Sequence, residues 1–287
     1  MLFLQAGING ILLGGIYTCV ALGFSLVWGV MNVINIAHGT FVMLGAYVTY
    51  WAFSLLGLDP FLSVPLSMAV LFLIGYLTQW GLINRLVRAP IFMTLVLTFG
   101  LDMLIVNLAL MAWKANYRSV NPRYASLSLS AGGLVVPYTR LAIFGVSLII
   151  SLLFYLFMTR TRTGRAIQAT RMDLEAARLV GVRIGRVYGL TFGISTAMAG
   201  GAGALLAIVA PVSPIMGGAY LGKVFLICVL GGLGSTAGAL VGGMVLGLFE
   251  TGAAVVFGPG YQDAVSLVLL LLVLILRPSG LLGRAYY

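Results

Sequence analysis

The polar residues that could do chemistry in this chain gather between two long apolar runs. Positions 32–40 read Asn-Val-Ile-Asn-Ile-Ala-His-Gly-Thr and contain the only histidine of the sequence. Unpartnered polar side chains are expensive in hydrocarbon, so such a cluster is expected either to cap helix ends or to contact a polar solute. A lone histidine without nearby Cys, Asp or Glu ligands does not predict a metal site. The candidate pathway residues here are Asn32, Asn35, His38, Gly39 and Thr40.

A second cluster follows a short apolar run at 218–231 and reads Gly-Gly-Leu-Gly-Ser-Thr. Ser235 or Thr236 can cap the next helix, whose first N–H groups could meet a carboxylate or carbonyl of a solute. A tight turn is the alternative interpretation. The candidate pathway residues here are Gly231, Gly232, Gly234 and Ser235.

The sequence motifs give little support for an enzyme. The segment 217–223 approaches a P-loop, but Val224 replaces the Ser or Thr that would hold Mg²⁺, so we expect no ATP binding by this chain. Asp102 is taken as the only acid well inside an apolar run, with a helix cap or an interhelical hydrogen bond as its structural alternative. No nucleophile–base arrangement or paired carboxylate is visible in the sequence.

The composition says which elements must position these residues. Of 287 residues, 61% are hydrophobic and 8% are charged, against about 25% charged in a soluble domain, which excludes a free globular enzyme. The runs predict an all-α polytopic membrane protein with about 8–9 spans in one domain, 1–287. The short, Gly-interrupted run at 218–231 is typical of a helix broken near the bilayer midplane. Broken or re-entrant helices are therefore expected near 30–39 and 218–237. Small residues spaced by four at 189, 193, 197 and 201 predict a helix-packing face.

The basic residues predict the topology. Seven arginines lie between Arg160 and Arg186, which places the loop 160–187 in the cytoplasm. Counting spans outward makes 114–140 the external loop, the N-terminus outside and the C-terminus cytoplasmic. Cytoplasmic loops also account for the net charge of +10, so no nucleic acid partner is predicted. Lys223 stays unassigned to either side.

Within that cytoplasmic loop, Leu174, Ala177 and Val180 recur at helical spacing, and Gly181 is a plausible end of the helix. This spacing predicts a short amphipathic helix outside the bilayer. It either rests on the membrane surface or docks a soluble partner.

Several motifs resemble one family. Glu175-Ala176-Ala177-x3-Gly181 is similar to the EAA loop through which ABC importer permeases contact their ATPases. Matching motifs accompany it at 14–17, 35–39, 43–47, 229–235 and 277–284. Nearly end to end, the chain resembles the branched-chain amino acid ABC importer permeases of the Ala-His-Gly subtype.

The resemblance implies a multi-pass permease of the bacterial inner membrane that works by alternating access and binds no cofactor itself. ATP and Mg²⁺ would bind to partner subunits. The implied partners are a second homologous permease, two cytoplasmic ATP-binding subunits, a periplasmic solute-binding protein and membrane lipid. The implied ATPase-coupling residues are Asp173, Glu175, Ala176, Ala177 and Gly181.

One departure concerns the solute. Many members have Glu directly after Ala-His-Gly, whereas this chain has Thr40. Urea, short amides or small organic acids are therefore alternatives to branched-chain amino acids, and the related urea-type permeases share most of these motifs. A self-sufficient secondary transporter or channel is the alternative from another class. It predicts a relay of several intramembrane acids.

Overall fold

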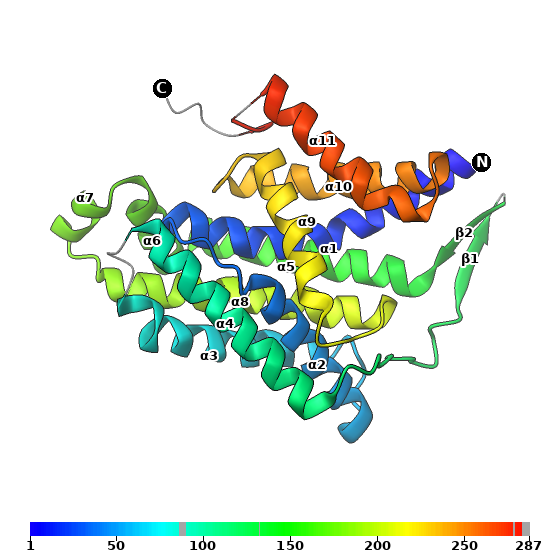
Figure 1. The fold of residues 1–287 in the computed structure, drawn as a ribbon, viewed down its shortest axis with the longest axis horizontal. Helices are drawn as coiled ribbons and strands as arrows, with labels where there is room; N and C mark the ends of the chain where they lie inside the picture. Colours follow the sequence, from blue (N-terminus) through cyan, green and yellow to red (C-terminus); the bar gives the residue numbers. More distant parts are fainter. Residues whose placement is uncertain (86–89, 132, 278, 283–287) are drawn as a thin grey trace.

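The computed structural model describes residues 1–85, 90–131, 133–277 and 279–282 (Figure 1). Within this part of the chain, eight helices are long and apolar enough to cross a membrane, and a ninth apolar helix, α9, is shorter. The prediction of an all-α polytopic protein is confirmed. The nine helices are α1 (Leu2–Met31), α2 (His38–Leu56), α3 (Ser63–Gly81), α4 (Ile91–Trp113), α5 (Tyr138–Arg160), α8 (Ile184–Val209), α9 (Met216–Gly231), α10 (Thr236–Val256) and α11 (Gln262–Leu276). Short 3₁₀ turns extend α3 at Ile83–Arg85 and precede α11 at Pro259–Tyr261.

Helix α1 is the axis of the bundle. It is apolar on all sides, and 89% of its most apolar window is buried, against 11% for α4 and 6% for the span that contains α11. In Figure 1, α1 runs along the long axis of the molecule, with α10 and α11 on one side of it, α8 and α3 on the other, and α9 crossing it. A helix that is hydrophobic all round belongs inside a bundle, which explains this position.

Glycines allow the closest helix contacts. Where α10 lies on α1, a Cβ added to Gly247 would come within 2.4 Å of the Gly10 carbonyl oxygen. Where α8 lies on α3, a Cβ on Gly189 would meet the Tyr76 ring at 2.8 Å. The predicted packing face of α8 is thereby confirmed, since small residues let helix backbones approach each other.

The first predicted break lies between α1 and α2. Asn32 ends α1 in the left-handed conformation, with φ 50°, and α2 starts six residues later at His38. The His38 ring contacts the Val20 carbonyl, eleven residues before the end of α1. At 1.5 Å per helical residue the chain has returned about 16 Å along α1 before α2 begins. The expectation of a re-entrant segment near 30–39 is confirmed.

The second break joins α9 to α10 as an antiparallel hairpin. A Cβ on Gly231 would lie 2.1 Å from the Gly238 carbonyl oxygen, and one on Gly242 would lie 2.6 Å from that of Ile227. The turn between α9 and α10 packs on Gly29, near the last turn of α1. The expectation of a broken or re-entrant helix near 218–237 is confirmed. Its glycines form a turn near the end of α1 and not an unwound segment halfway along the bundle.

The segment 114–137 contains the only sheet of the described residues, a hairpin of β1 (Ser128–Ala131) and β2 (Leu134–Pro137). The hairpin is fixed to the start of α1, because the Gln5 amide donates to the Val135 carbonyl at 2.8 Å and accepts from the Val135 N–H at 3.0 Å. A second attachment is the β-bridge between Arg118 and Val212. Burial and the nearby Asp59 carboxylate raise the pKa of Tyr124 in this segment.

The segment 160–187 folds into two short helices, α6 (Arg162–Met172) and α7 (Leu174–Leu179). Thr161 caps α6 by accepting a hydrogen bond from the Gly164 N–H, and Asp173 caps α7. In Figure 1 both helices lie at the end of the bundle opposite to the N-terminus and the β-hairpin.

Candidate translocation and coupling sites

His38 stands at the start of α2 in an apolar, fully buried position. Its Nε2 lies 3.0 Å from the Val20 carbonyl oxygen and must donate, because a carbonyl only accepts. Nδ1 then carries a lone pair without a partner among the described residues. The Phe24 ring packs edge-on against the imidazole. Asn35, three residues earlier, is fully buried, and neither atom of its amide has a partner in the described chain. His38 and Asn35 therefore both carry buried polar atoms without a hydrogen-bond partner among the described residues.

Thr40 and Asp102 meet between α2 and α4. The Thr40 hydroxyl, which is fully buried, donates a hydrogen bond to the Asp102 carboxylate. Of the two interpretations of Asp102, the interhelical hydrogen bond is thus the one observed. A carboxylate therefore stands beside position 40 although residue 40 is Thr.

Gly39 is the point where α2 meets the start of α9. A Cβ there would lie 2.1 Å from the Gly217 carbonyl oxygen, so no other residue fits without moving α9. The entry of α2, α4 and the start of α9 consequently form one contact region.

The glycine cluster at the other end of α9 forms a capped turn. Ser235 accepts a hydrogen bond from the Gly238 N–H at 3.0 Å, so Ser235 and not Thr236 is the cap of α10. Gly232 and Gly234 have φ of 101° and 77°, a region that favours glycine. The tight-turn interpretation therefore describes this cluster.

The chain returns to this turn near its C-terminus. The Leu281 N–H donates to the Leu230 carbonyl at 2.8 Å, and the Leu282 N–H donates to that of Gly231 at 3.0 Å. The motifs at 229–235 and 277–284, distant in sequence, are thus in contact as far as the latter is described. Residues 278, 283 and 284 of that motif lie outside the described residues.

The two predicted clusters do not form one site. Gly39 contacts Gly217 at the start of α9, and Gly231 ends that helix, which separates the clusters by about 21 Å along its axis. Asn32 is exposed and lines a hollow of about 370 Å³ together with Gly29 and Arg171. Gly234 also packs on Gly29. Asn32 therefore belongs with the second cluster.

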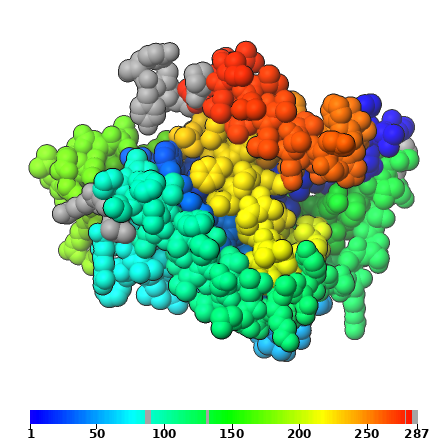
Figure 2. All heavy atoms as spheres, in the orientation of Figure 1, coloured from blue at the N-terminus to red at the C-terminus, as the bar shows by residue number. Residues whose placement is uncertain are grey.

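Helix α9 is open on one face. Figure 2 shows it at the surface between α4 on one side and α10 and α11 on the other. Gly218 and Gly222 are exposed on α9, and a Cβ at either would meet no atom within 4 Å. These two positions, four residues apart, leave room for a second helix to approach closely.

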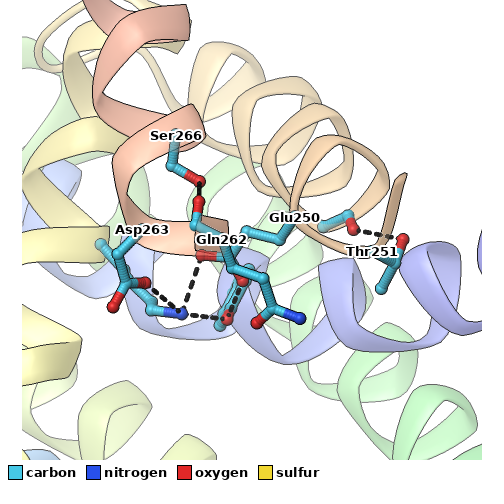
Figure 3. Close-up of polar contacts among 8 residues, drawn as sticks. Glu250, Thr251, Gln262, Asp263 and Ser266 are labelled. Carbon is cyan, nitrogen blue, oxygen red and sulfur yellow. Dashed lines mark hydrogen bonds and ion pairs between the residues drawn. The ribbon is translucent and has the colours of Figure 1, made fainter. Parts of the chain in front are cut away.

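A buried ion pair escaped the sequence analysis. Glu250 of α10 is 1% exposed, and its carboxylate accepts from Lys223 Nζ of α9 at 2.7 Å and from the Tyr17 hydroxyl of α1 at 2.5 Å (Figure 3). Lys223 Nζ also donates to the Tyr17 hydroxyl at 2.9 Å and lies 3.4 Å from the carboxylate of Asp263. The prediction that Asp102 is the only acid inside a span was wrong.

The signal for Glu250 was its position inside the apolar run 237–257. Its pairing with Lys223, 27 residues earlier, follows only from the way α9 and α10 fold back on each other. The ammonium and the carboxylate satisfy one another, so this pair fastens three helices together.

The predicted coupling residues form one compact helix. The N–H groups of Glu175 and Ala176 donate to Asp173 Oδ1 at 2.9 and 3.0 Å. Glu175 pairs with Arg178 at 2.6 Å, and Gly181 ends the turn with φ 85°. The helix and its glycine end were both predicted.

The two alanines of this helix differ in exposure. Ala177 is 3% exposed and packs within the chain, whereas Ala176 is exposed. The outward surface instead carries large apolar side chains, those of Met172, Leu179 and Val180.

Comparison with known proteins places the whole architecture in one family. Residues 7–274 match the family described as branched-chain amino acid transport system / permease component. The high-affinity branched-chain amino acid transport system permease protein BraD of Pseudomonas aeruginosa is 32% identical, over 98% of this chain and 96% of its own length. LivH of Escherichia coli is 33% identical over the same shares, and a probable LivH of Methanocaldococcus jannaschii is 26% identical.

No solved structure matches the chain. The matches cover the broken segments, the buried pair and the capped loop helix alike. The relatives are transport permeases and not enzymes. With its eight candidate spans and a match over nearly its full length, this chain is a multi-pass membrane protein that belongs to the branched-chain amino acid transport permease family.

Proposed function

We propose that this chain is one of two permease subunits of an ATP-driven importer that moves branched-chain amino acids inward across the bacterial inner membrane. The observation that carries the proposal is helix α7 outside the spanning bundle. Its ends are satisfied by Asp173 and Gly181, yet Leu179 and Val180 are 88% and 78% exposed. Such apolar side chains on a rigid, charged helix suit a protein partner.

The partner of α7 is a cytoplasmic ATP-binding subunit. Closure of two such subunits on ATP pulls on α7 and, through α6 and α8, on the bundle. ATP and Mg²⁺ bind on those subunits, and this chain holds no cofactor. Seven arginines between 160 and 186 support a cytoplasmic position for α7, with the N-terminus outside and the C-terminus inside. The β-hairpin is then on the side of the solute-binding protein.

The second permease covers the open face of α9. Gly218 and Gly222 give a partner helix close access there, and the pathway then runs between the two permeases. Each permease contributes the entry of α2, α4 and α9 to its wall. Asn35, His38, Gly39 and Thr40 are buried directly behind this wall, and Asn32 and the turn 231–235 lie at its cytoplasmic end.

Asp102 supports an amino acid as the solute. A zwitterion needs a negative group near its ammonium, and the carboxylate that residue 40 lacks is supplied by α4. Urea and short amides have no ammonium for Asp102, and an organic acid would be repelled by it. These solutes are the alternatives to be tested.

Proteoliposomes test the proposal. The chain with its permease partner, both ATPases and external binding protein should accumulate labelled leucine, isoleucine or valine when ATP is enclosed with the ATPases. Omission of the ATPases should abolish uptake. Equal uptake by this chain alone would mean a self-sufficient transporter or channel. Competition by urea or acetamide, but not by leucine, would transfer the proposal to those solutes.

A further inference from the structure

A second hollow, of about 460 Å³, lies between the end of α3 and the start of α8. It is separate from the candidate pathway, and α7 does not line it. Its lining combines basic, amide and aromatic side chains, contributed by Tyr76, Gln79, Trp80, Asn84, Arg183 and Arg186. The paired basic residues suggest an anionic ligand.

Gln79 is the feature that folding alone leaves unexplained. The residue is 1% exposed, and neither Nε2 nor Oε1 has a hydrogen-bond partner in the described part of the chain. A buried amide without partners destabilises a protein unless a ligand or water satisfies it. Because Gln79 lines the hollow, a polar molecule seated there is the candidate partner of its amide.

The start of α8 supplies positive charge to the same hollow. Arg183 is the N-cap of this helix of 26 residues and makes no side-chain capping bond. The N–H groups of Ile184 and Gly185, which line the hollow, therefore have no acceptor within the described chain. Arg183 and Arg186 are exposed, and neither has a carboxylate partner among the described residues. Two guanidinium groups beside an uncapped helix start suit a phosphate.

The outer face of α3 indicates where that phosphate comes from. Leu73, Leu77 and Trp80 are 57%, 54% and 73% exposed, and they follow each other along one face of the helix toward the hollow. Side chains of this kind contact acyl chains, and Trp favours the headgroup level of a membrane. An acyl chain on this face would have its headgroup at the hollow.

We propose that this hollow binds the headgroup phosphate of an anionic phospholipid of the cytoplasmic leaflet. Arg183, Arg186 and the first N–H groups of α8 hold the phosphate, Gln79 hydrogen-bonds the headgroup, and an acyl chain lies along α3. A lipid fixed there ties α3 to α8 beside the coupling loop. The proposal uses the orientation given above but does not depend on the transported solute.

Native mass spectrometry of the delipidated full-length chain, titrated with phosphatidylglycerol or phosphatidylcholine in detergent, tests the site. We expect saturable phosphatidylglycerol binding and at least tenfold weaker phosphatidylcholine binding. Arg183→Gln/Arg186→Gln should weaken phosphatidylglycerol binding about twenty-fivefold, since each basic residue near an anionic lipid contributes about fivefold. The matched control, Arg162→Gln/Arg165→Gln, changes the same charge on exposed positions of α6 and should have less than a twofold effect. Equal loss in both pairs would reduce the site to nonspecific attraction and overturn the proposal.

Two further variants keep the test decisive. Gly185→Asp places a carboxylate where a Cβ meets no neighbour, so the chain should stay folded and lose phosphatidylglycerol binding. Gln79→Leu should raise the thermal stability of the delipidated chain and weaken lipid binding. Inorganic phosphate that binds as tightly as phosphatidylglycerol would make the ligand a free anion. If Arg183→Gln/Arg186→Gln kept its lipid but lost the ATPase subunits on co-purification, the hollow would be a protein interface. Either outcome would overturn the lipid site and leave the importer proposal standing.

Discussion

The Thr40 hydroxyl on α2 donates its hydrogen bond to the Asp102 carboxylate on α4, and the two residues are 62 positions apart in the sequence. The pair brings an acid next to position 40, which is itself a threonine. Residue 40 and residue 102 should therefore be considered together when the solute of a family member is inferred from its sequence.

Removal of this acid is the first prediction. Asp102→Asn should lower leucine uptake at least tenfold, because a hydrogen bond between charged groups contributes about 1.5–3 kcal/mol. Thr40→Ser keeps the hydroxyl and should transport normally. Uptake is measured in proteoliposomes of the complete importer, with Asn107→Ala on the exposed side of α4 as a control. Unchanged leucine uptake by Asp102→Asn would show that the Asp102 carboxylate does not bind the ammonium group of the solute.

The buried pair of Lys223 and Glu250 predicts a double-mutant cycle. Lys223→Met alone leaves Glu250 with the Tyr17 hydroxyl only, and the loss of one partner of a buried pair costs about 3–5 kcal/mol. The double variant Lys223→Met/Glu250→Leu should recover most of the thermal stability. Thermal unfolding in detergent, followed by fluorescence, gives the stability of the wild type, Lys223→Met, Glu250→Leu and the double variant. A double variant as unstable as the sum of its parts would contradict a mainly structural role.

Helix α7 predicts opposite behaviour of two adjacent alanines. Ala176→Trp changes an exposed position and should leave the chain as stable as wild type while lowering recovery of the ATPase subunits on co-purification. Ala177→Trp fills a position that is 3% exposed and should destabilise the permease itself. Leu179→Asp should resemble Ala176→Trp. Full ATPase recovery in Ala176→Trp and Leu179→Asp would indicate a helix that rests on the membrane.

The glycines of α9 predict a separation of folding from assembly. Gly231→Ala brings a Cβ within 2.1 Å of the Gly238 carbonyl oxygen, so folding should fail or the chain should lose thermal stability. The Cβ of Gly222→Ile would have no atom of its own chain within 4 Å, so this variant should fold and fail to pair with the second permease. Size-exclusion chromatography of the co-expressed permeases separates the two effects. Normal pairing of Gly222→Ile would place the partner on another face.

The orientation is tested by accessibility. In a chain with Cys19→Ala and Cys228→Ala, single cysteines at Asn121 and Met172 should react with a membrane-impermeant thiol reagent from opposite sides. Both positions are exposed, so lack of access within the chain does not confuse the result. Labelling of both from the same side of intact cells would overturn the orientation and with it the position of α7.

The sequence predicted most of the fold because lipid imposes a simple rule. A segment that crosses hydrocarbon must be long, apolar and helical, so each span appears as a run that can be counted. Caps such as Ser235 and Gly181 were visible because their chemistry is local. The buried pair was not found, since Lys223 and Glu250 meet only after α9 folds back on α10.

The relation of the breaks to the bundle was equally invisible to the sequence. The turn at 232–235 has the same glycines whether it lies at the middle or at the end of α1, and only its contact with Gly29 decides the matter. The exposure of Ala177 likewise depends on how α7 packs on its neighbours. Features set by local sequence were predicted, and those set by packing of distant helices were not.

The central position of α1 also affects how the protein is made. The Thr18 hydroxyl of α1 donates a hydrogen bond to the Leu240 carbonyl, 222 residues later, so at about 5–20 residues per second the ribosome needs about 10–45 s to synthesise that partner. During this interval α1 stands in the membrane without the helix that will cover its glycines. Because α1 is apolar on every face, lipid can cover all of its surface until the later helices pack against it. A polar substitution on α1 that the finished bundle would tolerate should therefore still lower the yield of inserted protein.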